Sequence, residues 1–418
     1  KNTMKRTKDL HKQIKIFLLI MSVVIILFSQ KLYAQALHFI AYGDTRRDMK
    51  TMEKPQAKHH AIARVIRELN PDFILFSGDM IYYNEFERFL EVITSNYTGD
   101  KRIPLYPVIG NHELIFGEKI DTLIKDLLKK IGDVNKHEEQ LSPHTGLSHE
   151  IEILRGQLYK EINSIIEAKA KKRSRQVLCE EICNKLDPAY ISYLKEILCK
   201  TTNGQSWYSF FKEAHGLKIK FIALNSSLPD DEEQYQWFLG ELKQFGGPKI
   251  VFAHYPPYSI GHHGCTDMLN GESKASRFRD RYTKVFNNTS NNIVLVISGH
   301  EHNYQRICKT DKTGGIQLPT YIISGGGGAD LTGEGECNVS QIPLDGFHCI
   351  GLIPAHHFLD VTAHTDDNNN LILKCEALGL RYDPTGEIPD DDSFERHFVK
   401  DRLELIDNFT LNWQKQCN

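Results

Sequence analysis

The stretch NIVLVISGHEHNYQR, residues 292–306, decides how this chain folds. Six apolar or small residues, 293–298, precede Gly299 and the histidines His300 and His302. A short run of branched apolar residues that ends in glycine predicts a buried central β-strand leading into a loop. Two histidines two residues apart at such an end can turn towards one point, and imidazole suits zinc, iron and similar metal ions. The stretch therefore predicts a strand with candidate metal ligands at its carboxyl end.

Four other strand-like runs end in the same way. Their first loop positions hold oxygen or nitrogen ligands: Asp44 after LHFIAYG, Asp79 after FILFSG, Asn111 and His112 after LYPVIG, and His254 after KIVFA. In open α/β sheets, ligands bind at the carboxyl ends of the strands, so these loops are expected to gather on one rim. Two carboxylates, an amide and three histidines suit two adjacent metal ions with one carboxylate between them.

The order of these motifs, GD…GD…GNHE…H…GHEH, resembles the calcineurin-like metallophosphoesterases. The segments GDMIY, GNHE and GHEHNYQR are most similar to the purple acid phosphatase branch of that family. The resemblance covers residues 37–114 and 207–373 and implies an α/β fold, a four-layer α/β/β/α sandwich. It places a catalytic domain at residues 37–375, interrupted by a helical insertion at 117–203.

The resemblance also implies a role for each candidate ligand. One metal would be held by Asp44, Asp79 and His302, and the other by Asp79, Asn111, His254 and His300, so that Asp79 bridges the two. The implied cofactors are two metal ions, Fe³⁺ paired with Zn²⁺, Mn²⁺ or Fe²⁺. His112 is expected to protonate the leaving oxygen, a role that contributes typically ~10²–10⁴-fold to the rate.

The first motif departs from the broad family, which usually has the pattern D-x-H. Here Arg46 stands where that family has a metal-binding histidine. The GDxxY pattern supplies Tyr82, which the resemblance makes a tyrosinate ligand of ferric iron; the alternative is a packing aromatic. Arg46 could then contact the phosphate or pair with an acid, and the same alternatives apply to Arg306. His262 and His263 lie in a glycine-flanked loop and are expected to contact the substrate or to lie on the surface.

These motifs predict a secreted binuclear-metal phosphohydrolase. The leading interpretation is an acid phosphatase that cleaves phosphate monoesters of a small molecule or a phosphorylated substrate by attack of a metal-bound hydroxide. One alternative is a phosphodiesterase or nucleotidase with the same metals. Another is a non-catalytic binding protein that acts through the helical insertion, although the intact ligand set argues against it. A net charge of −3 gives no nucleic-acid footprint.

The N-terminal 36 residues have the composition of a targeting segment. A basic stretch, an apolar run of 13 residues (16–28) and an alanine-ending segment predict a signal peptide cut after Ala34 or Ala36. The alternative is an uncleaved signal anchor, the one case in which a membrane would be involved. Nine cysteines without a CxxC pair then predict disulfides with one thiol left over.

The remaining segments are read from their periodicity and turn residues. Residues 54–70 predict a helix with His59 and His60 on its surface, and hairpins are expected at 215–216 and 366–370. Glycines 325–328 lack the GK[ST] of a phosphate-binding loop and indicate close backbone packing beside the metal rim. The insertion could be a lid, a partner surface or a spacer, and residues 376–418 receive no role.

Overall fold

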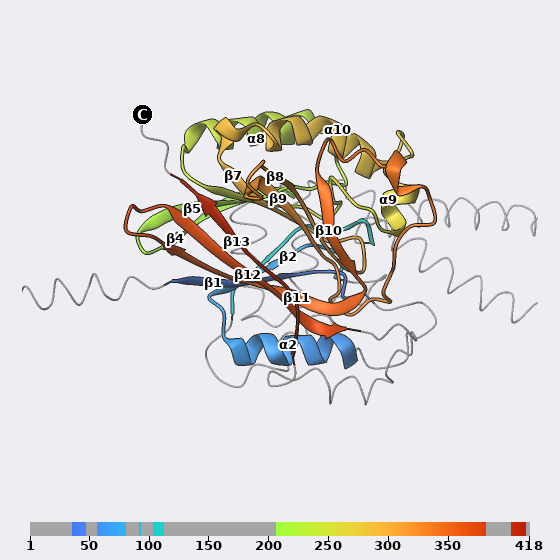
Figure 1. Cartoon of the computed structure of the whole chain (residues 1–418), viewed down its shortest axis with the longest axis horizontal. Helices are drawn as coiled ribbons and strands as arrows, with labels where there is room; N and C mark the ends of the chain where they lie inside the picture. The colour runs from blue at the N-terminus through green and yellow to red at the C-terminus, as the bar shows by residue number, and fades with distance from the viewer. Residues whose placement is uncertain are drawn as a thin grey trace, which may run out of the picture.

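Two β-sheets form the centre of the molecule, with helices on their outer faces (Figure 1). The structure is a computed structural model that describes residues 36–46, 57–80, 92, 103–112, 206–381 and 403–414. The predicted signal segment before residue 36, Tyr82 and the insertion at 117–203 lie outside the described residues. Among the described helices, none combines the length and the apolar character that a membrane crossing needs.

The first sheet has the strand order β13-β12-β11-β1-β2-β3. Its strands are β1 (Leu37–Tyr42), β2 (Phe73–Phe76), β3 (Leu105–Pro107), β11 (Ala355–Thr365), β12 (Leu371–Arg381) and β13 (Glu404–Trp413). Strands β1, β2 and β3 run parallel, so their carboxyl ends reach the same edge of the sheet. The others pair antiparallel, and β11 joins β12 through the turn predicted at 366–370.

The second sheet has the order β10-β8-β9-β7-β6-β5-β4. Its strands are β4 (Tyr208–Ala214), β5 (Leu217–Ala223), β6 (Lys249–Phe252), β7 (Ile293–Ser298), β8 (Tyr304–Thr310), β9 (Ile316–Ser324) and β10 (His348–Ile353). Strands β5, β6, β7 and β9 run parallel, and β7, the strand from which the sequence analysis began, lies in the middle of the sheet with all six residues buried. The hairpin predicted at His215 and Gly216 joins β4 and β5.

Three hydrophobic layers hold these elements together. Between the sheets lies the largest core, to which the first sheet contributes Phe39 and Phe73 and the second Phe221 and Phe252. Helix α2 (Ala57–Leu69) packs on the outer face of the first sheet. Helices α8 (Glu232–Gln244) and α10 (Lys274–Phe286) cover the outer face of the second sheet, and the short α9 (His262–Thr266) lies at its edge (Figure 1). Two single-turn 3₁₀ helices, η3 (Thr289–Asn291) and η4 (Val339–Gln341), complete the elements. The predicted four-layer α/β/β/α sandwich is confirmed.

Two expectations need correction. His59 is fully buried, because it faces the first sheet and its Nε2 lies 3.3 Å from the Tyr42 hydroxyl. The domain boundary placed at residue 375 falls inside β12, and β13 pairs with β12 along its whole length. Residues 376–381 and 404–413 are therefore part of the sandwich and not a separate segment.

Candidate metal centre

The predicted ligands lie where the parallel strands of both sheets end. Asp44 follows β1, Asp79 follows β2 and Asn111 follows β3, while His254 and His300 follow β6 and β7 of the other sheet. The two rims meet: the Nδ1 atom of His254 lies 2.9 Å from the carbonyl oxygen of Ser77 in the first sheet. The glycines at 325–328 permit a second close approach between the rims, since a Cβ on Gly325 would lie 2.8 Å from the Asp44 carboxylate and one on Gly327 2.2 Å from the carbonyl oxygen of Gly43.

Three of these residues have backbones that side chains rarely adopt. Asp44, Asp79 and His300 have φ angles of 59°, 54° and 71°, in the left-handed region that non-glycine residues seldom enter. Such conformations cost of order 1–3 kcal/mol each and cluster at functional sites. Here each one turns the side chain back over the rim as soon as its strand has ended. The strain therefore serves to bring the polar groups together.

Asp79 lies at the centre of the cluster. Its Oδ1 atom accepts a hydrogen bond from the backbone N–H of His112 at 3.0 Å and lies 3.4 Å from Nε2 of His254. Its Oδ2 atom lies 3.5 Å from Nε of Arg46 and 3.7 Å from Nε2 of His112. Burial raises the pKa of Asp79 to about 6, although the His112 N–H and the Arg46 charge oppose the shift. Asp79 is thus within reach of groups on both sides of the rim.

Asp44 and Asn111 flank Asp79. Asp44 accepts the backbone N–H of His300 at 2.9 Å, and its Oδ1 atom lies 3.7 Å from Nε2 of His302. The side-chain oxygen of Asn111 lies 2.7 Å from Nε2 of His254 and 3.0 Å from Nδ1 of His300. One amide oxygen and two imidazole nitrogens therefore converge on one point.

Each of the three histidines is held by its outer nitrogen. The Nδ1 atom of His302 lies 2.6 Å from the carbonyl oxygen of Asp330, and that of His254 lies 2.9 Å from the carbonyl oxygen of Ser77. Nε2 of His300 lies 2.9 Å from the carboxylate of Asp267. An acceptor at one ring nitrogen fixes the proton there and leaves the other nitrogen free as a metal ligand. All three inner nitrogens face the cluster.

The electrostatics of the cluster suit a metal ion. Burial lowers the pKa of His300 and of His302 well below the usual range, so both rings are neutral at pH 7, as ligands must be. Ligand atoms of Asp44, Asp79 and His254 all lie within 4.8 Å of one another. Buried carboxylates beside neutral imidazoles and an amide oxygen form a donor set for hard-to-borderline cations, and the residues present fit such ions.

The remaining predicted residues surround this cluster. Arg46 reaches it through Nε towards Asp79 and through NH2, 3.4 Å from Nε2 of His302. His112 is mostly buried beside Asp79. His263 is half-buried, with its ring centroid 4.0 Å from that of His300, whereas His262 is exposed to solvent. The structure thus brings Arg46, His112 and His263 to the centre and leaves His262 at its margin.

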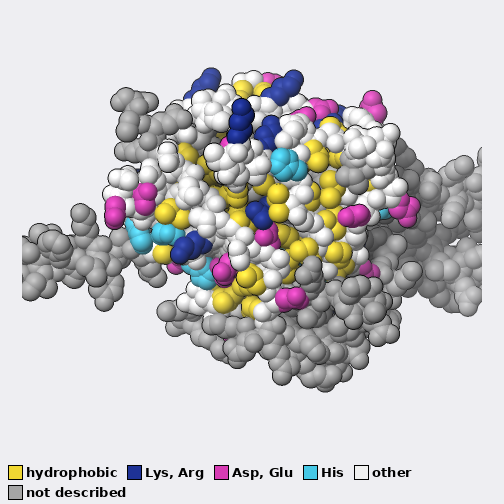
Figure 2. Space-filling model, viewed as in Figure 1, with side chains coloured by type: hydrophobic (Ala, Val, Ile, Leu, Met, Phe, Trp, Pro, Cys, Tyr) yellow, Lys and Arg dark blue, Asp and Glu magenta, His cyan; other side chains and the backbone are white. Residues whose placement is uncertain are grey.

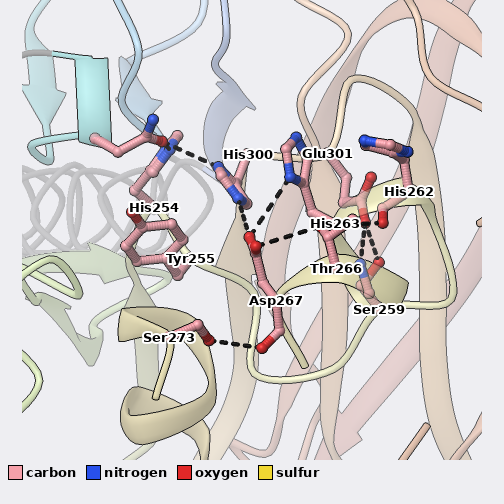
Figure 3. A network of polar contacts seen from close by, with 12 residues as sticks. His254, Tyr255, Ser259, His262, His263, Thr266, Asp267, Ser273, His300 and Glu301 are labelled. Atoms are coloured by element: carbon pink, nitrogen blue, oxygen red, sulfur yellow. Dashed lines mark hydrogen bonds and ion pairs between the residues drawn. The ribbon is translucent and has the colours of Figure 1, made fainter. Parts of the chain in front are cut away.

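A residue that sequence reasoning missed joins His263 to the centre. The Asp267 carboxylate lies 3.5 Å from Nδ1 of His263 and 2.9 Å from Nε2 of His300 (Figure 3). Burial alone would raise the pKa of Asp267, but the hydrogen bonds from the two histidines outweigh it and lower the pKa. For His263, burial lowers the pKa, and the hydrogen bond to Asp267 and the charge of Glu301 reverse the shift and raise it. The i, i+4 spacing of His263 and Asp267 was the one sequence signal for this contact.

Two further expectations are resolved away from the cluster. Arg306 does not face the rim: its Nε and NH2 atoms donate to the Asp407 carboxylate at 2.7 and 3.1 Å, so the pairing alternative is correct. Among the described cysteines, Cys265 and Cys337 form a disulfide. Cys308, Cys349 and Cys375 are free, which contradicts a single leftover thiol. Cys308 and Cys349 lie on adjacent strands, but in register they face His348 and Ile307 and not each other.

A comparison with models of protein families agrees with this architecture. A family model described as calcineurin-like phosphoesterase matches residues 37–304. A direct search of curated protein sequences found no match. Among solved structures, the chain is similar to a purple acid phosphatase from yellow lupin (Lupinus luteus) seeds, with 14% identity, a TM-score of 0.49 and coverage of 90% of this chain and 53% of the lupin chain. The chain thus spans about half the length of the lupin protein.

Two other solved structures are similar in the same range. A dimetal phosphatase from Danio rerio has 14% identity and a TM-score of 0.38, with coverage of 83% of this chain and 99% of that one. PhoD has 13% identity and a TM-score of 0.45, with coverage of 90% and 69%.

Proposed function

The chain belongs to the calcineurin-like phosphoesterase family, and we propose that it is a metal-dependent phosphoesterase, namely a binuclear acid phosphatase that hydrolyses phosphate monoesters. The observation that carries the proposal is the orientation of three buried histidines. Each is fixed by an acceptor at its outer nitrogen, so that its inner nitrogen points at Asp44, Asp79 or Asn111. A core packed only for stability would not need this arrangement three times.

Two metal ions would be held in adjacent sites. Asp44, Asp79 and His302 would hold the first, together with Tyr82 if it serves as a tyrosinate. Asp79, Asn111, His254 and His300 would hold the second, so that Asp79 bridges the pair. When bound, the two ions would supply Lewis-acid activation of a water molecule and of the phosphoester. We propose ferric iron with a divalent partner, Zn²⁺, Mn²⁺ or Fe²⁺.

The chain's own residues would bind and protonate the substrate. Arg46, at the mouth of the cluster, would donate hydrogen bonds to the phosphate oxygens as a planar guanidinium does. His112 would release the proton from its Nε2 atom to the departing alcohol oxygen. His263 would orient the phosphate from the α9 side, and the exposed His262 would contact only the outer part of a substrate.

A comparison of two chromogenic esters tests the proposal. Full-length protein loaded with iron and zinc is assayed with para-nitrophenyl phosphate and with its bis-ester, across roughly pH 4 to 9, a range that spans the titration of an ordinary histidine. A monoester preference that persists at acidic pH is expected. Asp79→Ala serves as the inactive control and should lose both metal ions along with turnover.

Two results would count against the proposal. A diester preference with a neutral or alkaline optimum would assign the site to a divalent-metal phosphodiesterase. No turnover of either ester by protein that holds two metal ions would overturn the monoesterase assignment.

We also propose that the protein works in an oxidising, extracytoplasmic compartment. The N-terminal composition and the Cys265–Cys337 disulfide support this location, since disulfides persist where thiols are not kept reduced. Fractionation of cells that express the full chain tests it. Recovery of the protein in the cytoplasm with both thiols reduced would contradict it.

A further inference from the structure

The acidic residue between the two metal-binding histidines, Glu301, has no place in the site described so far. We propose that Glu301 is a positioning residue: it holds the segment 259–264 so that His263 lies against His300. The proposal rests on the proposed function, in which His263 orients the phosphate. It concerns geometry only, because the Glu301 carboxylate is bonded to Ser259, Gly264 and Thr332 and to none of the predicted metal ligands.

The contacts of Glu301 all go to loops around the site. Its side chain is fully buried, and its Oε1 atom accepts hydrogen bonds from the Ser259 hydroxyl at 2.7 Å and from the backbone N–H of Gly264 at 2.8 Å (Figure 3). The Thr332 hydroxyl lies 3.4 Å from Oε2. A buried carboxylate must be hydrogen-bonded in this way, because an unpaired one costs several kcal/mol. Two of its three partners, Ser259 and Gly264, belong to the segment 259–264, which ends within α9.

The segment lies directly on the carboxylate. A Cβ on Gly261 would lie 2.6 Å from the Glu301 carboxyl carbon, so glycine is required for this approach. Gln305, on the next strand, holds the same segment from beside Glu301: its Oε1 atom accepts the Ile260 N–H at 3.0 Å and its Nε2 atom donates to the Ser259 hydroxyl at 3.1 Å. The loop that precedes α9 is thus attached to two side chains of the motif that carries the metal ligands.

The segment positions His263 beside His300. α9 begins at His262, directly after Gly261, and its next residue puts an imidazole 4.0 Å from the His300 ring. Glu301 is the chain neighbour of His300. The position of His263 is therefore set relative to the same backbone that sets the metal ligand. A shift of the segment would move His263 relative to His300.

Glu301 does more than fill space in the core, because burying its carboxylate is costly. An apolar side chain of similar volume would fill the same space without the desolvation cost of a carboxylate. A methyl or isobutyl group could not, however, hold Gly264 N–H and Ser259 at fixed distances. The carboxylate therefore contributes defined positions for the loop, which a site needs for tight orientation of its substrate.

A set of four variants tests the proposal in the full-length, metal-loaded protein. Glu301→Ala is expected to lower kcat/KM about 10- to 100-fold, as misplacement of an orienting group does. Glu301→Gln retains an acceptor for both donors and should stay within about threefold of the parent. His263→Ala should cause a loss like that of Glu301→Ala, and the double variant should lose no more than the worse single one, because both act on the same group.

Glu241→Ala is the matched control. Glu241 is also a largely buried carboxylate, bound to Lys220 and Ser209, but it lies on α8 away from the rim. Its loss should lower stability and leave kcat/KM unchanged. Metal content is measured for every variant, and two ions per chain are expected throughout.

Hydrogen exchange separates failure of this inference from failure of the proposed function. In Glu301→Ala, amides of residues 259–268 should exchange faster than in the parent, whether or not the protein turns over phosphate esters. Unchanged exchange would overturn the positioning role. So would additive losses in the double variant, or loss of metal by Glu301→Ala. Should Glu301→Ala not fold, Ser259→Ala removes one donor and should accelerate the same amides to a smaller extent.

Discussion

At the scale of single residues, the motif GHEHNYQR is informative because almost every side chain in it has a separate task. Gly299 makes room for Asp44, since a Cβ would lie 2.3 Å from its carboxylate. The two histidines face the ligand cluster. Glu301 and Gln305 hold the α9 loop, and Asn303 donates to the carbonyl oxygen of Thr332 at 3.0 Å. Eight consecutive residues thus connect the centre to its surroundings in several directions.

His112 is the residue whose removal best separates metal binding from proton transfer. Because its side chain is beside Asp79 while only its backbone N–H bonds to that carboxylate, His112→Ala should leave the metal ligands in place. We expect kcat to fall by about 10²–10⁴-fold for an ester with a poor leaving group. Para-nitrophenyl phosphate should suffer less, since its leaving group needs little protonation.

Metal analysis and the ratio of the two losses check this expectation. Two ions per chain with an equal loss for both esters would show that His112 binds substrate and does not donate a proton. Unchanged turnover would remove it from the reaction altogether.

The sequence predicted residues that directly follow strands far better than those that support them. Asp44, Asp79, Asn111, His254 and His300 were found because an apolar run ends and a polar residue follows. Asp267 and Asp330 were not, because their partners are 33 and 28 residues away and only the fold brings them together. His59 was misplaced for a related reason: its helix has an apolar stripe, and a histidine at its edge can still be covered by a sheet.

At the scale of elements, strands and turns determine most of the architecture. Hairpins at 215–216 and 366–370 follow from turn residues between alternating segments, and both are present. The strand β13 was missed although Phe409, Leu411 and Trp413 alternate with exposed residues. Acidic and asparagine residues dilute this short pattern, so only pairing with β12 makes it a strand. The alternation of apolar and polar residues is nevertheless present in the second half of the strand.

A cross-strand pair makes β1 sensitive to pH. The hydrogen bond from His38 on β1 to Asp360 on β11, 2.7 Å long, raises the pKa of His38. Because the pKa of His38 is higher in the folded than in the unfolded protein, protonation of His38 stabilises the fold. This stabilisation is complete at pH values below the pKa of the unfolded state, about 6.5, and is lost as the pH rises through the pKa of the folded state. The parent should therefore exceed His38→Gln in free energy of unfolding at about pH 5.5, by on the order of 1 kcal/mol, and the difference should shrink at alkaline pH.

Urea unfolding of both proteins at the two pH values measures this difference. Asp360→Asn is the matched variant: it removes the acceptor of the same hydrogen bond and should abolish the same pH dependence of stability. A difference that grows with pH would have the wrong sign and would contradict the assignment.

The Cys265–Cys337 disulfide attaches α9 to the loop around Cys337. Cys265 lies in α9 and Cys337 is 72 residues further on, so the bond closes a long loop. Replacing both cysteines by serine should cost about 2–4 kcal/mol of stability. It should also lower kcat/KM severalfold, because His263 lies in α9 and Asp267 follows directly after it.

Cys349→Ser is the control, because that thiol is free and away from the rim. Thermal unfolding and ester hydrolysis are measured for both variants. A stability loss without any change in kcat/KM would show that the bond holds the fold but not the α9 side chains.

At the scale of the whole molecule, an ion pair joins the two sheets. Arg306 on β8 and Asp407 on β13 belong to different sheets, and the Tyr304 hydroxyl also donates to Asp407 at 2.7 Å. The side chains of Arg306 and Asp407 are 12% and 18% exposed, so removal of one leaves the other nearly buried and unpaired. Arg306→Leu should therefore destabilise the fold by about 3 kcal/mol.

A double-mutant cycle with Asp407→Leu measures the coupling. The double variant should be less unstable than the sum of the single ones by about 1–3 kcal/mol. Glu213→Gln, which breaks the exposed contact to Lys218, is the control and should change stability by less than about 1 kcal/mol. Additive losses would mean that Arg306 acts through its packing on Phe409, 4.8 Å from the ring centroid, and not through its charge.

Figure 2 shows the face formed around these strands, where apolar side chains lie among scattered charged ones. β13 is the edge strand of the first sheet and contributes Phe409, Leu411 and Trp413 to the core between the sheets, and the Trp413 indole N–H donates to the side-chain oxygen of Asn292, just before β7, 3.0 Å away. This strand is also the last described one to leave the ribosome. Until residues 404–413 have left the ribosome, the nascent chain holds all its ligand-bearing loops. Its β12 edge is still unpaired, however, and the core between its sheets is open at this seam. Synthesis therefore exposes this seam to chaperones and to other nascent chains, and metal capture before its closure would occur on an unfinished domain.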